Sequence, residues 1–408
     1  MAFSAQTILI AGGGIVGLTL AVALKRELGA AADVVVADPA LFATRPESLR
    51  GLRVSALAPD CRRLLERTGA WTRVAPEAQP VTAMRLTDSA LEDPVRSALF
   101  GFDADPAEGE PLAHMVANDD VADALLEQAR LAGVILLARR VVRWNADVMA
   151  SGGAGVARLD GGETMTAHLL VAADGARSSL RAEAGIEWYG WSYGQSGVVA
   201  TISHSRPHHG VATQHFLPSG AFAILPLTGN RSSIVWSERD ENIPAIRALD
   251  REDLLAEIRR RFGLERGSLH LDHYPVGVFP LSLGVARRFH APGMVLAGDA
   301  AHQVHPIAGQ GLNLGLRDVM ALEELVVRAI RLGLPAADGE TAREYDRRRR
   351  ADVMAMALTT DAINRLFSND VAPLRLLRGV GARLVGRAPG IRRFMARRAA
   401  GLASIARG

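Results

Sequence analysis

Three stretches of the chain hold residue types that bind nucleotides, and the first lies near its start. Gly12-x-Gly14-x-x-Gly17 directly follows an apolar stretch and precedes a helical pattern. Such glycines permit a tight turn and let a pyrophosphate approach the positive N-terminus of a helix. An acid about 20 residues further on accepts a hydrogen bond from a ribose hydroxyl in sites of this type, and Asp38 lies at about this spacing. The pattern predicts an adenine dinucleotide site without separating NAD from FAD.

A second glycine pattern occurs in GDAAHQVHPIAGQGLNLGLRD, residues 298–318. There, Gly309-x-Gly311-x-x-x-Gly315 is one residue longer than the dinucleotide fingerprint, and no strand pattern runs directly into it. Asp299 follows an apolar run, so its carboxylate would stand at a strand end and reach a ribose or ribityl hydroxyl. The helix that opens after it would present free N–H groups, which favour an anion or an electron-rich oxygen. A reduced isoalloxazine ring carries such a charge.

The third stretch, VAADGARSSLR at residues 171–181, allows two interpretations. Asp174 follows an apolar strand pattern and could bind a ligand at the strand end. Alternatively, Ser178 or Ser179 caps a helix and Asp174 only stabilises its first turn. The residues alone leave both interpretations open.

The periodicity of the chain predicts how these stretches are positioned. Strand, helix and strand alternate over residues 6–37, which is typical of a parallel sheet covered on both faces. Residues 195–285 hold short strands at hairpin spacing, which indicates an antiparallel sheet. We therefore predict an α/β fold in which a Rossmann-like cofactor domain with a parallel sheet is interleaved with an antiparallel-sheet substrate domain, followed by C-terminal helices. The predicted segments are 1–75, 113–184 and 287–365 for the cofactor domain, 76–112 and 185–286 for the substrate domain, and 366–408 for a basic helical region.

Taken in order, the three motifs resemble those of the flavoprotein aromatic hydroxylases, which are single-component FAD monooxygenases of the p-hydroxybenzoate hydroxylase type. Within that group the chain is most similar to the ubiquinone-biosynthesis hydroxylases. The resemblance covers roughly residues 5–395. The stretches that carry it are SALAPDCRRLLERTGAW, WSYGQSGVVATI, QHFLPSGAFAILPL, the VW of SSIVWSE and REYDRRRRADVMAMALTTDAINRLFS.

The resemblance implies that one extended FAD is held by distant parts of the chain. Asp38 would hold the adenosine ribose, although flavoproteins more often use Glu there, and Asp299 would hold the ribityl chain. Asp174 would serve both FAD and the nicotinamide donor, and residues 309–313 would cradle the isoalloxazine. The residues implied to bind FAD are Gly12, Gly14, Ile15, Val16, Gly17, Asp38, Arg53, Asp174, Asp299, Gly309, Gln310, Gly311, Leu312 and Asn313.

The resemblance also implies the chemistry. Reduced FAD would react with O2 to a C4a-hydroperoxide, whose distal oxygen is transferred to a phenol ring; the cofactor carries the difficult step. The implied substrate is a polyprenyl phenol of ubiquinone biosynthesis. NAD(P)H would dock transiently as electron donor, or a protein would replace it, since no second fingerprint is present. Pro306 would lie near the flavin face where oxygen reacts.

Other assignments stay open for the substrate and the reaction. The chain could hydroxylate a soluble aromatic compound, reduce its substrate on the same fold, or serve as a non-catalytic assembly subunit. His215 and Gln214, on an expected strand of the substrate domain, could face the phenol or solvent, and no base for the phenol is identified. His302 and His305 have a metal-like spacing without a nearby cysteine. We expect them to shape the flavin pocket and expect no metal site.

Charge is concentrated at the end of the chain. The net charge is +3, yet the residues from Val371 onward include nine arginines and no acid. The basic character therefore does not indicate nucleic-acid binding. Apolar and basic residues of 372–388 separate on a helical wheel, which suits either an anionic membrane surface or a protein contact, in a quinone-biosynthesis complex or a homo-oligomer. With a single cysteine, Cys61, and no membrane-spanning pattern, we expect a cytoplasmic protein peripheral to the inner membrane.

Overall fold

The computed structural model describes residues 5–43, 50–88, 91, 98–104, 109–147, 153–217, 219–274, 276–305 and 309–367 of the 408-residue chain. Pro306 lies outside these residues. The basic region lies outside them from residue 368 onward, and so does its predicted amphipathic pattern.

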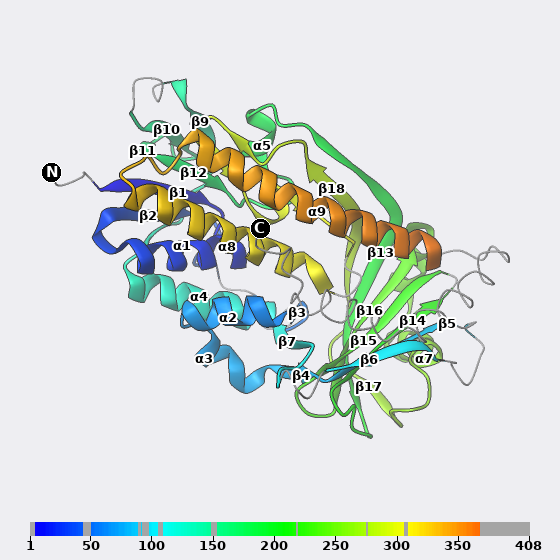
Figure 1. The fold of residues 1–408 in the computed structure, drawn as a ribbon. Coiled ribbons are helices and arrows are strands. Elements are labelled where there is room, and N and C mark those ends of the chain that lie inside the picture. Colours follow the sequence, from blue (N-terminus) through cyan, green and yellow to red (C-terminus); the bar gives the residue numbers. More distant parts are fainter. Residues whose placement is uncertain are drawn as a thin grey trace.

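A six-stranded, mostly parallel sheet forms one end of the molecule (Figure 1). Its central strands are short apolar runs such as ILIA and VVVA, because both faces of such a sheet are buried. Only the edge strand β19 pairs in antiparallel fashion, with β20. In spatial order the strands are β19 (His290–Ala291), β20 (Met294–Leu296), β12 (Leu169–Ala172), β1 (Gln6–Ala11), β2 (Ala32–Ala37) and β8 (Ile135–Leu137).

Helices cover one face of this sheet, and a small antiparallel sheet covers the other (Figure 1). The helices are α1 (Ile15–Leu28), α4 (Asn118–Ala132) and α8 (Gln310–Arg331), and α1 contacts both of the others. The small sheet consists of β11 (Thr164–Ala167), β10 (Gly155–Leu159) and β9 (Val141–Asn145). Flanking elements are α2 (Pro59–Arg67), α3 (Trp71–Val74) and α5 (Ser179–Glu183).

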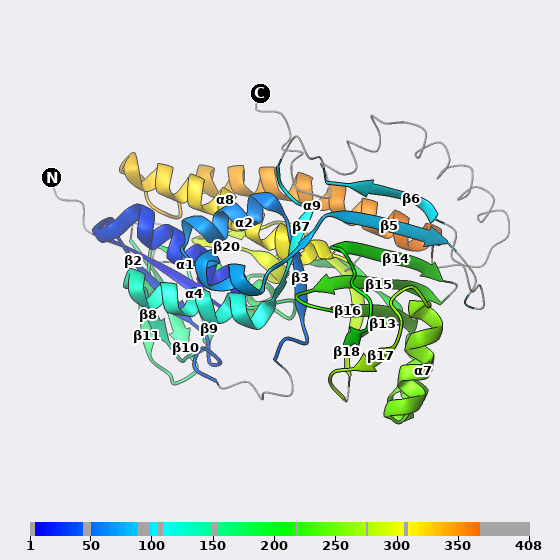
Figure 2. The same ribbon diagram turned by 90° about the horizontal axis from the view of Figure 1, so that it is seen from below.

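A nine-stranded sheet forms the other end of the molecule (Figure 2). Its pairs are antiparallel except for β14 with β5. Its path runs through β21 (His302–Gln303), β18 (Gly277–Ala286), β13 (Trp188–His204), β16 (Arg231–Arg239), β15 (Gly220–Leu227), β14 (Val211–Leu217), β5 (Ala83–Asp88) and β6 (Ala98–Asp103), and β17 (Leu269–Leu271) pairs with β13. A further sheet of β3 (Val54–Leu57), β7 (Ala113–Ala117) and β4 (Gln79–Val81) lies between the two ends.

The two faces of the nine-stranded sheet have different neighbours, because successive side chains of a strand point to opposite faces. Phe222 and Trp236 are buried in a core that includes Leu254 and Ile258 of α7 (Arg251–Phe262), which follows α6 (Ile243–Ala248). The intervening residues, such as Ala223, point away from this core.

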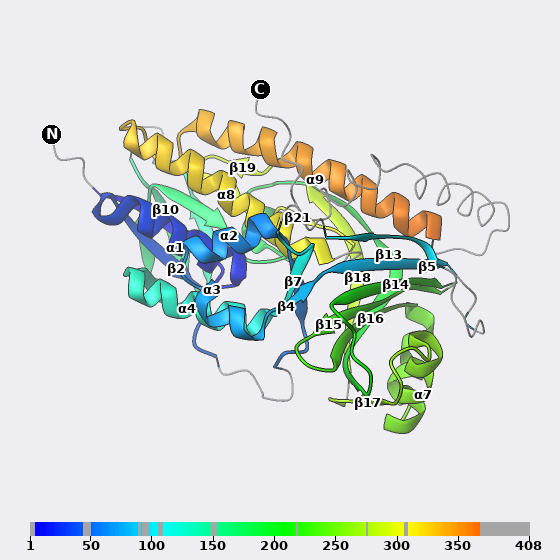
Figure 3. The same ribbon diagram turned by 60° about the horizontal axis from the view of Figure 1, so that its bottom comes forward.

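The long helix α9 (Gly339–Phe367) joins the two ends of the molecule. It runs beside α8 and then crosses to the nine-stranded sheet, where it contacts β15 and β18 (Figures 1 and 3). Within the part of the chain that the structure describes, no helix is long and apolar enough to cross a bilayer.

The predicted fold class, with a parallel cofactor sheet and a separate antiparallel sheet, is confirmed. Strands of both sheets alternate along the chain, as an interleaved arrangement requires. The bounds of the six predicted segments stay a prediction.

Candidate active site

The strand register brings the predicted motifs to one edge of the parallel sheet. Ala11 pairs with Ala37 and with Ala172, and Ala172 pairs with Leu296. The carboxyl ends of four parallel strands therefore lie side by side, which is where ligands bind in open α/β sheets. The residues that follow these ends include Gly12, Asp38, Asp174 and Asp299.

The first glycine turn is tightly packed at two positions and open at the third. Gly12 has a φ of +119°, and a Cβ there would lie 2.2 Å from the carbonyl oxygen of Ala173. A Cβ on Gly17 would lie 2.0 Å from the Gly12 carbonyl oxygen, so helix and turn need both glycines. Gly14 precedes α1, and a Cβ there would meet nothing within 4 Å. The N-terminus of α1 also has no side-chain cap, so its N–H groups can receive a phosphate.

Asp38 secures this turn. Its Oδ2 accepts a hydrogen bond from the backbone N–H of Gly13 at 2.7 Å, and its Oδ1 accepts one from Ala40 at 2.7 Å. The carboxylate thus ties the end of β2 to the glycine loop, a role that the sequence did not indicate. The ribose contact of Asp38 stays a prediction.

Val16 explains the odd spacing of the second glycine pattern. A Cβ on Gly315 would lie 2.6 Å from Val16 Cγ2, and a Cβ on Gly298 would lie 3.2 Å from the same atom. These glycines therefore let α8 and the turn at Gly298 pack closely on α1. Ile15 is half-buried beside the same core. The side chains of Ile15 and Val16 pack the helices, which leaves their backbone for the predicted cofactor contact.

Asp174 makes the capping contact of one interpretation, and its ligand role stays a prediction. Its Oδ2 accepts from the backbone N–H of Ser179 at 3.0 Å, and the hydroxyl of Ser178 accepts from Arg181 N–H at 3.0 Å, so the start of α5 is capped. The second carboxylate oxygen, Oδ1, is buried and has no hydrogen-bond partner among the described residues. A buried oxygen without a partner is costly, so a donor from a ligand would stabilise it.

Arg181, which sequence reasoning missed, connects the second and third motifs. Its buried guanidinium donates to the carbonyl oxygens of Ala176 at 3.0 Å and Ala300 at 2.9 Å. The same group lies over the ring of Trp188, 4.0 Å from the centroid. Burial lowers the pKa of Arg181, and the charge of Asp174 opposes this shift. Arg181 thereby fixes the spacing between the turns that carry the two aspartates.

Asp299 lies in the turn Gly298–Ala300 after β20, close to Arg53. Its side chain is solvent-accessible, yet protein atoms surround it densely, and this desolvation raises the pKa of its carboxyl above the usual value. The charges of His302 and Arg53 oppose the increase. Arg53 is itself exposed and lies over the ring of Phe279, 5.5 Å from the centroid. The resemblance implied both Asp299 and Arg53 as FAD-binding residues, and the charge of Arg53 acts on Asp299 in the structure.

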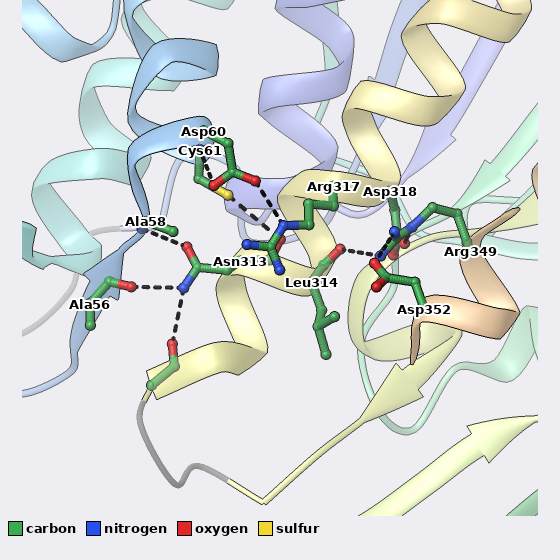
Figure 4. A network of polar contacts seen from close by, with 11 residues as sticks. Ala56, Ala58, Asp60, Cys61, Asn313, Leu314, Arg317, Asp318, Arg349 and Asp352 are labelled. Carbon is green, nitrogen blue, oxygen red and sulfur yellow. Dashed lines mark hydrogen bonds and ion pairs between the residues drawn. The ribbon is translucent and has the colours of Figure 1, made fainter. Parts of the chain in front are cut away.

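The start of α8 offers backbone rather than side chains to a ligand. Gly309 is the N-cap residue of α8, with a φ of +64°, and no described side chain hydrogen-bonds to the free N–H groups there. A Cβ on Gly311 would meet nothing within 4 Å. The Asn313 side chain is fully buried and turned away: its Oδ1 accepts from Ala58 N–H at 2.9 Å and its Nδ2 donates to the Ala56 carbonyl at 2.8 Å (Figure 4).

Other side chains near the start of α8 also contact the protein. Leu312 packs against the main core, and Gln310 is buried. Arg317 donates to Asp60 of α2 at 2.8 Å, beside Asn313 (Figure 4). Cys61 also lies on α2, and burial raises the pKa of its thiol, which therefore stays protonated. At residues 309–313 the predicted contacts to the isoalloxazine would therefore come from backbone N–H groups. Contacts with α2 and the residues before it hold this helix start in place.

A buried ionic network lies directly behind the Asp299 turn. Asp318 accepts hydrogen bonds from His302 Nε2 at 2.6 Å, Arg349 Nε at 2.7 Å and the backbone N–H of Gly298 at 2.9 Å. Arg349 also donates to Asp352 at 2.6 Å (Figure 4). Burial alone would raise the pKa of Asp318, but the charges of His302 and Arg349 and their hydrogen bonds lower it overall. His302 thus supports the turn through Asp318.

A cavity of about 140 Å³ meets the start of α8 between the nine-stranded sheet and the sheet of β3, β7 and β4. An engineered cavity of about 150 Å³ binds benzene, so the space suits one aromatic ring. Its described lining has no Asp, Glu, Lys or Arg. Burial lowers the pKa of His305 to about 4, so this imidazole is neutral near pH 7. The polar lining residues are Thr213, Gln214, Ser237, His305 and Gln310.

Of the two residues predicted to be catalytic, the structure places one away from the cavity and does not describe the other. Gln214 lines the cavity, whereas the next residue, His215, points to the other face of β14. There it is buried, 2.6 Å from Thr87 Oγ1 and stacked on Phe222, so His215 faces neither this cavity nor solvent. Pro306, predicted near the reacting flavin face, lies outside the described residues.

These features together fit FAD. An open glycine turn, a carboxylate oxygen that needs a donor and a second uncapped helix start lie along one edge, and an aromatic-sized cavity adjoins the last of them. The fold and site define a flavin-dependent oxidoreductase with a ring-sized cavity beside the second helix start.

Comparisons with known proteins agree with a flavin-binding protein. Residues 5–360 match the family described as FAD binding domain. Ubiquinone hydroxylase UbiL of Rhodospirillum rubrum is 41% identical over 97% of this chain and 89% of its own length, and 3-demethoxyubiquinol 3-hydroxylase of Escherichia coli is 33% identical over 97% and 98%. The chain belongs to the FAD-dependent monooxygenases of the ubiquinone-biosynthesis hydroxylase family.

A solved structure shows the same fold at lower sequence identity. That of p-nitrophenol 4-monooxygenase PnpA from Pseudomonas putida DLL-E4 superposes with a TM-score of 0.77, at 19% identity over 100% of both chains. The likeness extends across both sheets, since it covers the whole chain.

Proposed function

We propose that this enzyme hydroxylates the aromatic ring of a polyprenyl phenol in ubiquinone biosynthesis, using O2 and a two-electron reductant. The observation that carries the proposal is the cavity beside α8, which is apolar, ring-sized and lined by no described charged residue. A neutral phenol would lose little on entering it. An ionised aromatic acid would bury an unpaired carboxylate, which is strongly unfavourable.

The residues of the site would have distinct tasks. Bound FAD supplies the activation of O2 and the transfer of one oxygen atom to the ring. The loop at Gly14 would hold its pyrophosphate, Asp299 its ribityl chain, and the N–H groups after Gly309 its isoalloxazine. Because the cavity adjoins Gly309 and Gln310, the substrate ring would lie next to the flavin and away from bulk water.

The donor and the cellular setting extend this proposal. We infer that NAD(P)H docks transiently, with Asp174 assisting, since the described glycine turns suit a single dinucleotide. The basic residues from 371 onward would attach the enzyme to an anionic membrane surface or to a quinone-biosynthesis complex, where a polyprenyl substrate is found. Self-association through the same region is an alternative form of this attachment.

Deletion of the gene followed by mass analysis of the quinone pool tests the function. We expect a precursor that lacks one ring hydroxyl to accumulate. An unchanged pool would contradict the proposal. The accumulated species would also identify the ring position.

An assay with the purified holoenzyme separates the remaining alternatives. We expect 2-geranylphenol to stimulate NAD(P)H oxidation and to gain one oxygen atom from ¹⁸O2, whereas 4-hydroxybenzoate should do neither. Turnover of the soluble acid instead would assign the enzyme to small aromatic compounds. Equal product yield without O2 would indicate a reductase.

A further inference from the structure

Gln214 is a buried residue whose amide faces the candidate cavity and has no hydrogen-bond partner among the described residues. Its side chain is 3% exposed, lies on β14 and lines the cavity. No side-chain hydrogen bond of Gln214 occurs within the described part of the chain, although an amide has two donors and an acceptor. Buried polar groups are nearly always hydrogen-bonded, so an unpaired amide that faces a cavity points to a ligand.

The surroundings of Gln214 show why the sheet itself cannot satisfy this amide. Its neighbour on β15 is Ala223, and the next residue across the sheet is Val235 on β16. All three lie on the cavity face, and the two neighbours are apolar. Ser233 and Ser237 flank Val235 on that face of β16, and Ser237 lines the cavity. Neither hydroxyl makes a side-chain hydrogen bond with the described residues.

We propose that Gln214 binds the hydroxyl of the substrate ring and thereby sets both substrate specificity and the orientation of the ring toward the flavin. An amide donates and accepts at once, so it can hold a neutral hydroxyl in either role. The polar groups of His305 and Gln310 lie on the flavin side of the same cavity. The ring is then held from the sheet and faces α8. This inference rests on the proposed function, because it presumes a phenolic substrate.

The selectivity of the site follows from the same amide. A site built to bind a hydroxyl rejects an analogue that lacks it, because the protein group is left unpaired. Affinity for the ring hydroxyl should therefore depend on Gln214, whereas affinity for the prenyl chain should not. A substitution that only disturbs packing would weaken both equally.

A double-mutant-cycle design on the FAD-loaded enzyme tests this prediction. The two ligands are 2-geranylphenol and geranylbenzene, which differ by the hydroxyl, and binding is followed by the change in flavin absorbance. Gln214→Met keeps the length of the side chain and removes its hydrogen bonds. We expect about tenfold weaker binding of the phenol and less than about twofold change for geranylbenzene. Uncoupled oxidation of NAD(P)H should also increase, since the ring is no longer oriented.

Matched variants control for packing. Leu225→Met alters an apolar lining residue at nearly constant volume and should affect both ligands alike. Gln214→Asn keeps the amide but withdraws it by one methylene, and it should show the same selective loss as Gln214→Met. FAD absorbance and thermal unfolding confirm that each variant is folded and loaded.

The outcomes separate the two proposals. If the wild-type enzyme hydroxylates 2-geranylphenol but both Gln214 variants lose equal affinity for the two ligands, or lose none, the role of Gln214 is wrong and the function stands. If the wild-type enzyme neither binds nor hydroxylates the phenol, the proposed function fails first. Selective loss with the phenol alone supports both.

Discussion

The flavin edge and the substrate cavity are built in different ways. At the edge, the proposed binding groups are backbone N–H groups at Gly14 and at the start of α8, together with carboxylates at strand ends. In the cavity, the proposed binding groups are single side chains such as Gln214 and Ser237, contributed by separate strands. Backbone sites need short contiguous motifs, whereas side-chain sites need only the right face of a strand.

The two regions also differ in charge. Behind the edge lies the buried network of Asp318, His302 and Arg349, whereas the described lining of the cavity has no charged residue of the Asp, Glu, Lys or Arg type. The turn at Gly298 is therefore braced by buried polar contacts, whereas the cavity is lined mostly by apolar side chains. Changes at the edge should affect folding and FAD uptake, and changes in the cavity should affect the substrate.

The largest effect is expected from Gly12→Ala. The new Cβ would approach a backbone oxygen to 2.2 Å, at a φ that disfavours alanine. The new Cβ and the Ala173 oxygen follow the central strands β1 and β12, so neither can move away without displacing a strand. We expect a loss of at least about 3 kcal/mol in the free energy of unfolding and little FAD uptake, measured by denaturation and flavin absorbance.

Gly14→Ala is the matched control at the same turn. A Cβ there meets no atom of the protein, so the apoprotein should unfold at nearly the wild-type temperature. FAD affinity should nevertheless fall, because the methyl group would occupy space next to the helix start. Normal FAD binding by Gly14→Ala would place the pyrophosphate elsewhere.

Asp318→Asn is expected to have the next largest effect. It removes the carboxylate shared by Arg349, His302 and Gly298 N–H, and it leaves a buried guanidinium without that partner. Breaking a buried ion pair costs about 3–5 kcal/mol. Because the pKa of Asp318 is lower in the folded protein than in the unfolded chain, its contribution is complete at neutral pH and is lost as the pH falls below about 4.

The control for this network is an exposed pair on α9, the helix that carries Arg349. Glu340→Gln removes the partner of Arg343, which lies 2.9 Å away with both side chains mostly in solvent. Such pairs contribute about 1 kcal/mol or less. Equal stability losses from Asp318→Asn and Glu340→Gln would show that the buried network does not brace the Asp299 turn.

The difference between edge and cavity also explains what could be predicted from the sequence. The edge motifs are contiguous, and strand ends in a parallel sheet must meet, so Gly12, Asp174 and Asp299 could be placed together in advance. The roles of these residues as FAD ligands stay predictions. The packing role of Gly315 required the position of Val16, which lies far away in the chain.

Side-chain direction was the main limit of the sequence. His215 and Gln214 are adjacent on one strand, so one of them had to point away from the substrate, and no local pattern identified which. Arg349 did leave a signal, because within a run of four arginines it alone shares the four-residue spacing of the buried Tyr345, Val353 and Ala357. The ion pair of Arg349 with Asp318 could not be deduced from the sequence, because Asp318 lies on another helix.

A smaller effect is expected in the cavity, from His305. Its imidazole is buried with a pKa of about 4, whereas an unfolded chain has a value near 6.5. The unfolded chain therefore binds a proton first, and wild-type stability should fall as the pH drops from about 6.5 toward 4. As the pH falls from 7 to 5.5, the free energy of unfolding of His305→Gln should decrease by about 1 kcal/mol less than that of the wild type.

Denaturation of both proteins at several pH values measures this difference. Between pH 7 and 8 the curves should run parallel, since His305 is neutral in both states of the wild type. Identical slopes below pH 6.5 would mean that the imidazole takes up its proton in the folded protein, and the cavity would then acquire a charge.

Tyr193→Phe should have the smallest effect and probes the connection between α9 and the cavity. The Tyr193 hydroxyl donates to Asp361 of α9 at 3.1 Å, and its ring packs edge-on against His305 at 4.9 Å. The substitution keeps the ring contact, and Asp361 stays paired with Arg365, so we expect a loss of about 0.5–1 kcal/mol in unfolding free energy. Tyr189→Phe, which removes an exposed bond to Glu187, should cost less. A larger change in substrate affinity than in stability for Tyr193→Phe would show that α9 positions His305 and that the cavity, like the flavin edge, depends on a polar brace.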